Sequence, residues 1–402
     1  MTDSKLKTEM NTQMNTQMNS KSSDAITDSE ARKSNSKKRV LVAMSGGVDS
    51  SVAAALLVEQ GYEVIGATMQ VWDYSQCEIE EGFGTCCSSI DVDDARAVAD
   101  RLNIPFYVIN CESKFKEKVI DPFVRAYLNG ETPLPCVNCN TFLKFDYLIK
   151  KMKELNCDYL ATGHYAQIER KASGDYALIT SADDWKDQTY FLFTLPQSIL
   201  SRILFPIGHI NKPEVRKIAE QKGLTVARKK DSTGICFVGP KGYSQFVEEQ
   251  IQNDPELLKE LKKGPIRRFP NGEIMGYHEG IHHYTYGQSK GLGLTYHEKL
   301  FVLKVDARTK AVWVGDEKYL FHDELEIENA HWISEISDNE ELNVKIRYQH
   351  KGAPARLFKK VDSETQKEIY SVKFGEPQRA ITPGQAAVIY RGKELVGGGW
   401  II

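Results

Sequence analysis

The sequence predicts an α/β fold whose first and largest part is a doubly wound parallel sheet. Apolar runs of strand length alternate with amphipathic helices as far as residue 205, helices separated by Gly/Pro turns continue to residue 295, and short alternating strands follow. The 402 residues are 41% hydrophobic and 27% charged, which is typical of globular proteins with more than one domain. We therefore expect a doubly wound domain over 39–205, a small, mainly helical domain over 206–295, and an antiparallel barrel or sandwich over 296–402.

The first 38 residues form a polar, repetitive leader in which Met, Asn, Thr and Gln recur over 10–19. Such a segment buries too little apolar surface to offset the entropy lost on ordering, so we expect it to be disordered. It lacks the apolar stretch of a secretory signal, and Asp24, Asp28 and Glu30 argue against an organellar transit peptide. No window approaches the roughly 18 apolar residues that a membrane span requires. We therefore expect a cytoplasmic protein whose eight cysteines are mostly reduced.

The first domain is expected to begin with a βαβ unit. The apolar run 39–43 predicts a buried strand, the Gly-rich segment 44–51 leads into an Ala/Leu-rich helix over 52–60, and a second strand follows at 63–69. The crossover between these strands should be right-handed. The alternation continues through a helix over 91–102, a strand at 105–109, helices over 114–128 and 142–155, and a strand at 159–162. This order of elements predicts the doubly wound sheet.

The later part of the chain is expected to change from helices to strands. Helices are predicted over 213–223 and 243–262. Apolar residues alternate in 301–305 and again in 312–314 after a turn, so these two segments predict a hairpin. Further strands are expected at 343–348, 369–374 and 385–390. Strands this short, separated by turns, are typical of an antiparallel sandwich or barrel.

The loop 45–50 (SGGVDS) lies between the first strand and the first helix. Its glycines allow backbone N–H groups to approach an anion, and the dipole of the helix N-terminus favours negative charge. Ser45, Ser50 and Ser51 add hydroxyl donors, and a divalent cation such as Mg²⁺ would give Asp49 a role beside phosphates. The loop lacks the Gly-Lys-Ser/Thr ending of a P-loop, which excludes a kinase or GTPase loop. It resembles the pyrophosphate loop of N-type ATP pyrophosphatases, and a Ser/Gly turn with a helix cap is the simpler alternative.

Two cysteine-containing segments are candidates for the rest of the chemistry. Cys136 and Cys139 lie in a Pro-rich segment, 132–140, before an expected helix whose N-terminus can lower the pKa of a thiol. Cys236 follows the basic tract 228–230 and a Gly-containing turn. A thiolate near positive charge is a competent nucleophile and a competent carrier of persulfide sulfur.

With these motifs in place, the chain resembles the tRNA-specific 2-thiouridylases, which make 2-thiouridine at the wobble position of certain tRNAs. The resemblance runs from about Arg39 to the C-terminus. The family's markers occur in order at 45–51, 61–64, 135–140, 161–165, 186–192, 216–219, 230–237, 287–293 and 383–385. So many ordered matches are very specific.

The resemblance implies a pyrophosphatase-type α/β domain, a small linking domain and a C-terminal β-barrel. It implies ATP with Mg²⁺ as the cofactor, with Asp49 as a candidate Mg²⁺ ligand, and it implies tRNA and a persulfide-donating sulfur carrier or desulfurase as partners. It makes Cys139 the nucleophile and Cys236 the persulfide carrier. The implied ATP-binding residues are Ala43, Met44, Ser45, Gly46, Gly47, Val48, Asp49, Ser50, Met69 and Gly163. The residues implied to contact tRNA are Leu134, Pro135, Cys136, His164, Lys186, Asp187, Gln188, Arg347, Tyr348 and Gln385.

Two departures from the family pattern affect these expectations. Leu134 and Cys136 stand where many members have Asn and some have Asp, which puts in doubt a mechanism that needs an acid or base at position 136. Ser289 stands where the family usually has Arg, which removes a positive charge near the expected RNA surface. The net charge of -3 also provides no overall basic field for RNA.

The implied reaction has two stages. The uridine C2 oxygen attacks the α-phosphorus of ATP and becomes a group that leaves as AMP, with pyrophosphate as the other product. A persulfide on Cys236 then supplies sulfur, and Cys139 attacks its inner sulfur to form a disulfide and release sulfide at the base. Alternatively, Cys136, Cys139 and Cys236 ligate an iron–sulfur cluster with one open iron. Three thiolates suit such a cluster better than structural zinc, which normally takes four ligands.

Two other functions compete with tRNA thiolation. A small-molecule amide or nucleotide synthetase would use the loop 45–51 but would not need Cys139 and Cys236. A protein that only binds tRNA would need neither the loop nor the thiols. Cys77, Cys111 and Cys157 are expected to be packing or surface thiols. Cys86 and Cys87 could extend a metal site, but we expect an ordinary thiol pair at the start of a helix. The pair His282 and His283 suggests metal but lacks a spaced partner, so we expect surface polar sequence.

Overall fold

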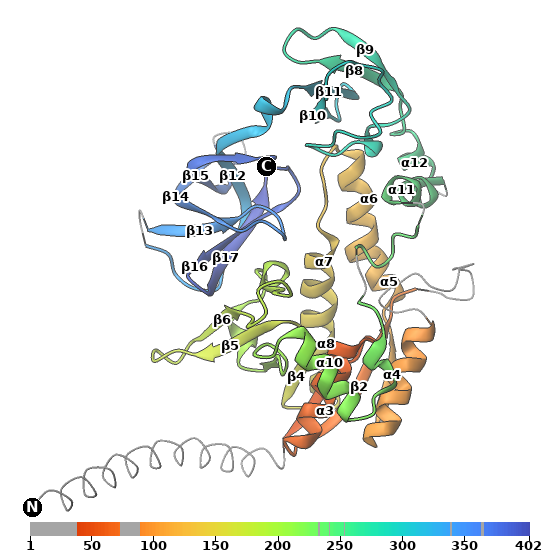
Figure 1. The fold of residues 1–402 in the computed structure, drawn as a ribbon, viewed down its shortest axis with the longest axis vertical. Coiled ribbons are helices and arrows are strands. Elements are labelled where there is room, and N and C mark those ends of the chain that lie inside the picture. The colour runs from red at the N-terminus through yellow and green to blue at the C-terminus, as the bar shows by residue number, and fades with distance from the viewer. Residues whose placement is uncertain are drawn as a thin grey trace, which may run out of the picture.

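The computed structural model describes residues 38–72, 89–231, 234–240, 242–252, 254–337, 340–362 and 366–402. The expected disorder of the leader, over 1–37, and the expectations for Cys77, Cys86 and Cys87 lie outside the described residues. Three sheets organise the fold (Figure 1). Within the described ranges, no helix combines the length and apolar character that crossing a bilayer requires.

A parallel sheet of five strands, in the order β3-β2-β1-β4-β7, forms the N-terminal domain. Its strands are β1 (Arg39–Ala43), β2 (Glu63–Gln70), β3 (Phe106–Asn110), β4 (Tyr159–Thr162) and β7 (Ile203–Leu204). All four pairings are parallel, so the predicted doubly wound sheet is confirmed. The strand order reverses around β1, and ligands of such sheets bind beyond the carboxyl ends of the strands at this point.

Helices cover both faces of the parallel sheet (Figure 1). Along β1, Val40 and Val42 join a core with helices α3 and α10, whereas Leu41 faces a second core with α6 and α8. This alternation follows from the two-residue period of a strand. The helices of this domain are α3 (Val48–Glu59), α4 (Ser89–Leu102), α5 (Glu112–Phe115), η2 (Lys116–Ile120), α6 (Asp121–Leu128), α7 (Pro135–Asn138), η3 (Cys139–Tyr147), α8 (Leu148–Glu154), η4 (Thr189–Phe191), α9 (Gln197–Leu200), α10 (Lys212–Gln221) and η5 (Thr225–Arg228).

The helix predicted to begin at residue 142 begins at Pro135 instead. Proline is favoured in the first turn, where a helix leaves its N–H groups without partners, and so it can start this one. The helix continues from α7 through the π-helical segment η3 into α8. Cys136 and Cys139 therefore lie within the first turns of a helix, and our expectation that they lie on a loop before it was wrong.

The middle of the chain begins with helices, as predicted, and continues into a four-stranded sheet in the order β10-β11-β8-β9. Its elements are α11 (Tyr243–Gln252), α12 (Pro255–Leu258), β8 (Gly264–Arg268), β9 (Ile274–His278), η6 (Ile281–His283), β10 (Phe301–Asp306) and β11 (Ala311–Gly315). The hairpin of β10 and β11 was predicted, but we expected it in the C-terminal barrel. It pairs with β8 instead, through parallel bonds between β8 and β11.

The C-terminal part is an antiparallel sheet in the order β12-β15-β14-β13-β16-β17, which a pairing between β12 and β17 closes into the predicted barrel. Its elements are η7 (Glu317–Leu320), β12 (Phe321–Trp332), β13 (Glu341–Lys345), β14 (Ala353–Val361), β15 (Glu368–Arg379), β16 (Ala386–Arg391) and β17 (Glu394–Ile401). The hairpin of β5 (Ala166–Arg170) and β6 (Tyr176–Thr180) extends this sheet by pairing with β17. Backbone bonds therefore join the barrel to the N-terminal domain.

Candidate active site

The loop between β1 and α3 has the backbone geometry of an anion-binding turn. Gly46 has a φ of +69°, and a Cβ there would lie 2.1 Å from the carbonyl oxygen of Asp91, so only glycine fits. Gly47, the N-cap residue of α3, makes no side-chain cap, and the Ser51 hydroxyl donates back to its carbonyl oxygen at 2.8 Å. The simple helix cap that we considered is therefore not formed at this N-cap, and the first amides of α3 suit a phosphate.

The end of β4 packs directly against this loop. A Cβ at Gly163 would lie 2.5 Å from the backbone nitrogen of Ser50 and 2.7 Å from the carbonyl carbon of Asp49. The Ser45 N–H donates to Oγ of Ser50 at 3.1 Å, which closes the loop. Met69 lies near the end of β2 and is 8% exposed. The expected ATP-binding residues thus come from the carboxyl ends of neighbouring strands, the edge where open α/β sheets bind ligands.

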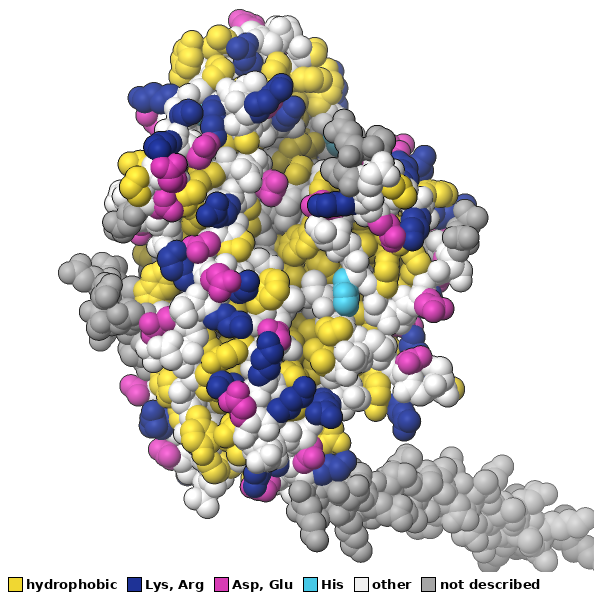
Figure 2. Space-filling model, turned by 180° about the vertical axis from the view of Figure 1, so that it is seen from behind, with side chains coloured by type: hydrophobic (Ala, Val, Ile, Leu, Met, Phe, Trp, Pro, Cys, Tyr) yellow, Lys and Arg dark blue, Asp and Glu magenta, His cyan; other side chains and the backbone are white. Residues whose placement is uncertain are grey.

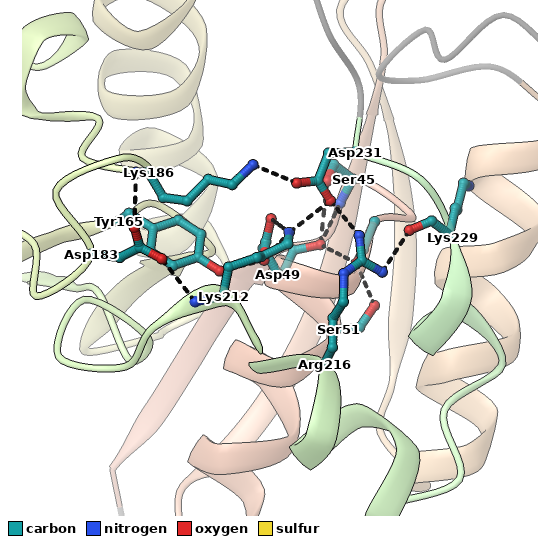
Figure 3. A network of polar contacts seen from close by, with 12 residues as sticks. Ser45, Asp49, Ser51, Tyr165, Asp183, Lys186, Lys212, Arg216, Lys229 and Asp231 are labelled. Carbon is teal, nitrogen blue, oxygen red and sulfur yellow. Dashed lines mark hydrogen bonds and ion pairs between the residues drawn. The ribbon is translucent and has the colours of Figure 1, made fainter. Parts of the chain in front are cut away.

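Asp49 lies at the centre of a network of charges (Figure 3). The Lys212 ammonium donates to both of its carboxylate oxygens, at 2.7 and 2.8 Å, and the Tyr165 hydroxyl donates to Oδ1 at 2.9 Å. The same ammonium lies 2.8 Å from Oδ1 of Asp231, and its side chain is only 9% exposed. Burial and the adjacent Asp49 raise the pKa of Tyr165, so this phenol remains a neutral donor. One buried cation therefore joins the loop to the segment before Cys236.

Asp231 is the second anionic centre of the network. Besides Lys212, it accepts from Nζ of Lys186 at 2.6 Å and from the Arg216 guanidinium at 2.7 Å. Burial acts to raise the pKa of Asp231, but the hydrogen bonds from Lys186 and Lys212 outweigh it and hold the pKa below its usual value. Three cations thus converge on one carboxylate, and a phosphate group could be bound by the same set.

Lys229 ties the basic tract to the loop. Its ammonium donates to the Gly46 carbonyl oxygen at 3.1 Å and forms ion pairs with Asp91, at 2.6 Å, and Asp94. Burial acts to lower the pKa of Lys229, but these two carboxylates raise it overall, so the ion pairs persist at neutral pH. Arg216 also donates to the Lys229 carbonyl oxygen at 2.9 Å. The chain leading to Cys236 is therefore held across the loop.

Sequence analysis assigned no role to Lys212, Arg216, Lys229 or Asp231. Charged residues of these types are normally found on solvated surfaces, and the network links residues up to 183 positions apart. The local signals were the basic tract 228–230, which we had noted beside Cys236, and the family markers 216–219 and 230–237, which contain Arg216 and Asp231. A long-range network of this kind requires the fold to be known.

The cysteines of interest lie on one side of the parallel sheet. Cys139 and Cys236 are both half-buried and pack against the same hydrophobic core, which contains Cys111 and residues of α5, α6 and α8. Burial raises the pKa of Cys111 to about 12, and the adjacent Cys139 contributes to this shift. The ring of Phe237, which follows Cys236, lies 5.1 Å from that of Phe123. Both proposed sulfur-bearing segments therefore contact the core that includes α6.

A family model described as the tRNA methyl transferase HUP domain matches residues 38–240, a PRC-barrel domain model matches 255–316, and an aminomethyltransferase β-barrel domain model matches 322–401. A tRNA-specific 2-thiouridylase from Geotalea uraniireducens is 49% identical over 92% of this chain and 96% of its own length. The chain belongs to the tRNA-specific 2-thiouridylase family. Members from Geobacter metallireducens and Carboxydothermus hydrogenoformans are each 46% identical over 91% of this chain, covering 97% and 98% of their own lengths.

The resemblance to 2-thiouridylases also implied a set of tRNA contacts, and one of them, Gln385, bonds the backbone just before another part of the set, 134–136. The Gln385 side chain, on the barrel, donates to the carbonyl oxygen of Thr132 at 3.0 Å and to that of Pro133 at 3.4 Å. The Thr132 N–H donates in turn to the Pro383 carbonyl oxygen at 3.0 Å. The barrel therefore positions the segment that leads into Leu134, Pro135 and Cys136.

His164, which the resemblance implied to contact tRNA, is buried after the end of β4. It is 7% exposed, it lies between the rings of Phe145 and Phe205, and its Nδ1 is 2.7 Å from the hydroxyl of Thr162. Burial, followed by the positive charge of Lys144, lowers its pKa well below 6.5, so the imidazole is neutral. A neutral ring in an aromatic pocket suits an uncharged group better than a phosphate.

The remaining expected tRNA residues of this 2-thiouridylase divide between structural and exposed positions. Asp187 is buried and accepts from the Ser181 N–H at 3.0 Å, and burial raises its pKa. Gln188 accepts from the Tyr165 N–H at 3.0 Å, which anchors its amide. The ring of Tyr348 lies 4.6 Å from that of Phe191, next to Arg347. Segments 187–191 and 345–348 therefore meet where the barrel joins the N-terminal domain.

Trp185 is a further candidate for contact with nucleic acid, and sequence analysis missed it. Its side chain is 94% exposed, although it directly precedes Lys186, whose ammonium bonds Asp231. The Trp185 N–H donates to Oδ1 of Asp183 at 3.1 Å, so the backbone is held while the indole points away. Basic and acidic side chains are interspersed over the face in Figure 2. A nucleic acid on this face would therefore meet local groups of this kind and not a continuous basic field.

Proposed function

We propose that the chain thiolates C2 of the wobble uridine in tRNAs of the Lys, Glu and Gln type. In this proposal ATP adenylates the C2 oxygen and a persulfide on Cys236 supplies the sulfur. The names of the relatives from Geotalea and Geobacter support thiolation of tRNA. The observation that carries the proposal is the shared ammonium of Lys212, which bonds Asp49 on the loop and Asp231 before Cys236.

The first stage places ATP phosphates at the loop 45–51. The amides at the start of α3 and the serine hydroxyls face the phosphates, and Lys186, Lys212 and Arg216 exchange part of their contact with Asp231 for phosphate oxygens. Asp49 and the hydroxyls of Ser45 and Ser50 are oxygen donors of the type that Mg²⁺ prefers, so they fit that ion. When bound, Mg²⁺ neutralises charge that develops on the leaving pyrophosphate.

The second stage transfers sulfur. The Cys139 thiolate attacks the inner sulfur of the Cys236 persulfide, a Cys139–Cys236 disulfide forms, and hydrosulfide leaves. Hydrosulfide adds to C2 of the adenylated uridine, and the C2–O bond breaks as AMP departs. A thiol reductant then returns two electrons to the disulfide. The half-buried position of Cys139 against the core that Cys236 also contacts supports its role beside that thiol.

Recognition of tRNA is proposed at the junction of the barrel and the N-terminal domain. The segment 134–136, Lys186, Arg347 and Gln385 line this junction or bond its segments. Trp185 is proposed to stack on a base, because an almost fully exposed indole offers an open π-face beside Lys186. The substrate would thus bridge the loop and the barrel.

The Cys236→Ser variant tests the sulfur stage. With tRNA, ATP and a persulfide donor, we expect it to release pyrophosphate but to form no 2-thiouridine. Cys157→Ser is the matched control, because Cys157 is buried just before β4 and has no proposed role. Full thiolation by Cys236→Ser would rule out the relay.

Iron and sulfide analysis of anaerobically purified protein tests the alternative cofactor. The persulfide relay predicts a colourless, iron-free and active enzyme. A stoichiometric cluster lost in Cys136→Ser, Cys139→Ser and Cys236→Ser would instead support iron–sulfur chemistry.

Pyrophosphate release that does not depend on tRNA would favour a small-molecule synthetase.

A further inference from the structure

Glu248, His282 and His283 form a compact cluster outside the proposed active site. Oε1 of Glu248 lies 3.1 Å from Nε2 of His282 and 3.2 Å from Nε2 of His283. Glu248 is on α11, and both histidines are on η6. In the described part of the chain, no other group of three His, Cys, Asp or Glu ligand atoms is this close together.

The two distances from Oε1 of Glu248 match the spacing of neighbouring ligand atoms in a zinc site. Zinc–nitrogen and zinc–oxygen bonds of about 2.0–2.1 Å in tetrahedral geometry separate neighbouring ligand atoms by about 3.3 Å. The two Glu248–histidine distances are within about 0.2 Å of that separation. Two imidazoles and one carboxylate are also a ligand set that zinc uses, with a fourth position left for water.

The environment holds one ligand rigidly and leaves the others accessible. His282 is 2% exposed, and a Cβ at Gly280 would lie 2.4 Å from its Cε1, so its ring packs closely on the backbone. Its Nδ1 is buried without a hydrogen-bond partner, which leaves Nε2 as the polar contact of the ring. Glu248 and His283 are 37% and 35% exposed, so an ion can enter from solvent.

We propose that Glu248, His282 and His283 bind a zinc ion that ties α11 to the middle sheet. Ile281, the first residue of η6, and Tyr284, which follows η6, belong to the core of that sheet. On α11, the ring of Phe246 lies 5.1 Å from that of Phe237, which follows Cys236. The ion therefore fixes the helix on which the Cys236 segment packs, and this role does not depend on the reaction proposed above.

Metal binding is tested on the full chain after chelation. Cobalt is the first probe, because cobalt bound to thiolates shows an intense near-ultraviolet charge-transfer band that nitrogen and oxygen ligands do not give. We expect one equivalent of cobalt to bind without that band and to be displaced by zinc. Zinc should also raise the thermal midpoint of the chelated chain.

The variants Glu248→Gln and His283→Ala identify the ligands, and both leave the buried His282 in place. Since changes even outside the ligand set cost about 10–100-fold in metal affinity, we expect at least that loss in each. His297→Ala is the matched control, because this histidine is exposed and lies apart from the cluster. Equal metal affinity in the two variants and the control would overturn the proposal. A thiolate charge-transfer band, or no metal bound to the parent chain, would also overturn it. Circular dichroism of the metal-free variants checks that they are folded.

Discussion

Lys212 on α10 donates to both carboxylate oxygens of Asp49 on the loop, at 2.7 and 2.8 Å, although 163 positions separate the two residues. The same ammonium lies 2.8 Å from Asp231. A single buried cation therefore contacts both the proposed phosphate site and the chain that leads to Cys236. If phosphate replaced one carboxylate, the other would have to adjust, so the proposal links nucleotide binding to the position of this segment.

Replacing Lys212 with Met should affect both stability and catalysis. The change leaves two carboxylates close together without their shared cation. Breaking a fully buried ion pair costs about 3–5 kcal/mol, and these pairs are partly solvated. We therefore expect the free energy of unfolding to fall by about 2 kcal/mol. Pyrophosphate release should fall by about 100-fold or more. Lys222→Met is the control, since its pairing with Glu59 is at the surface and should be worth under about 1 kcal/mol. Equal effects of the two changes in urea unfolding would contradict this assignment.

Gly163→Ala should damage the loop through backbone contact alone. Its Cβ would lie 2.5 Å from the backbone nitrogen of Ser50, so the start of α3 must move. We expect a loss of about 1–3 kcal/mol in stability and weaker ATP binding, measured by urea unfolding and calorimetry. Gly375→Ala, where a Cβ meets nothing within 4 Å, should leave ATP binding unchanged. Normal ATP affinity in Gly163→Ala would show that the nucleotide binds elsewhere.

Asp231→Asn should destabilise the chain in a pH-dependent way. The pKa of Asp231 in the folded chain lies below its ordinary value of 3.8, so its stabilisation is fully present above pH 3.8 and is lost as pH falls through the folded pKa. The stability difference between the parent and the variant should therefore be constant from pH 5 to 7 and shrink below pH 3.8. Asp184→Asn, at an exposed position, should show no such trend. A stability difference between the parent and Asp231→Asn that grows on acidification would contradict this interpretation.

Trp185→Ala should weaken tRNA binding without affecting the fold. Stacking of one base on an aromatic ring is worth about 1–3 kcal/mol, so we expect the dissociation constant to rise about 5–150-fold. Trp185→Phe should retain most of the affinity, and tRNA should quench fluorescence in the parent but not in Trp185→Phe. Tyr277→Ala removes an aromatic ring that is 73% exposed on β9 and serves as the control. Unchanged affinity in Trp185→Ala would exclude stacking.

Local sequence patterns predicted most of the parallel sheet because its central strands, β1, β2 and β4, are buried on both faces. The runs 39–43 and 159–162 match β1 and β4, whereas β7 has only two residues and gave no pattern. The hairpin 301–314 was also found, but its partner β8 is set by pairing between distant segments. Nothing within a hairpin specifies which sheet it joins.

The candidate site was predictable only where chemistry is local. The loop 45–50 requires glycine at position 46, and its Ser/Gly sequence before a helix pointed to phosphate. The network of Lys212 and Asp231 was not predictable, because its members look like ordinary surface charges. The same holds for Glu248, which becomes a partner for His282 only when α11 packs on η6.

The most direct test of the central claim uses tRNA whose target uridine carries ¹⁸O at C2. If the C2 oxygen attacks the α-phosphorus of ATP and departs with AMP, mass spectrometry will find one ¹⁸O in AMP for each 2-thiouridine formed. Label in water or inorganic phosphate, with unlabelled AMP, would contradict adenylation of the base.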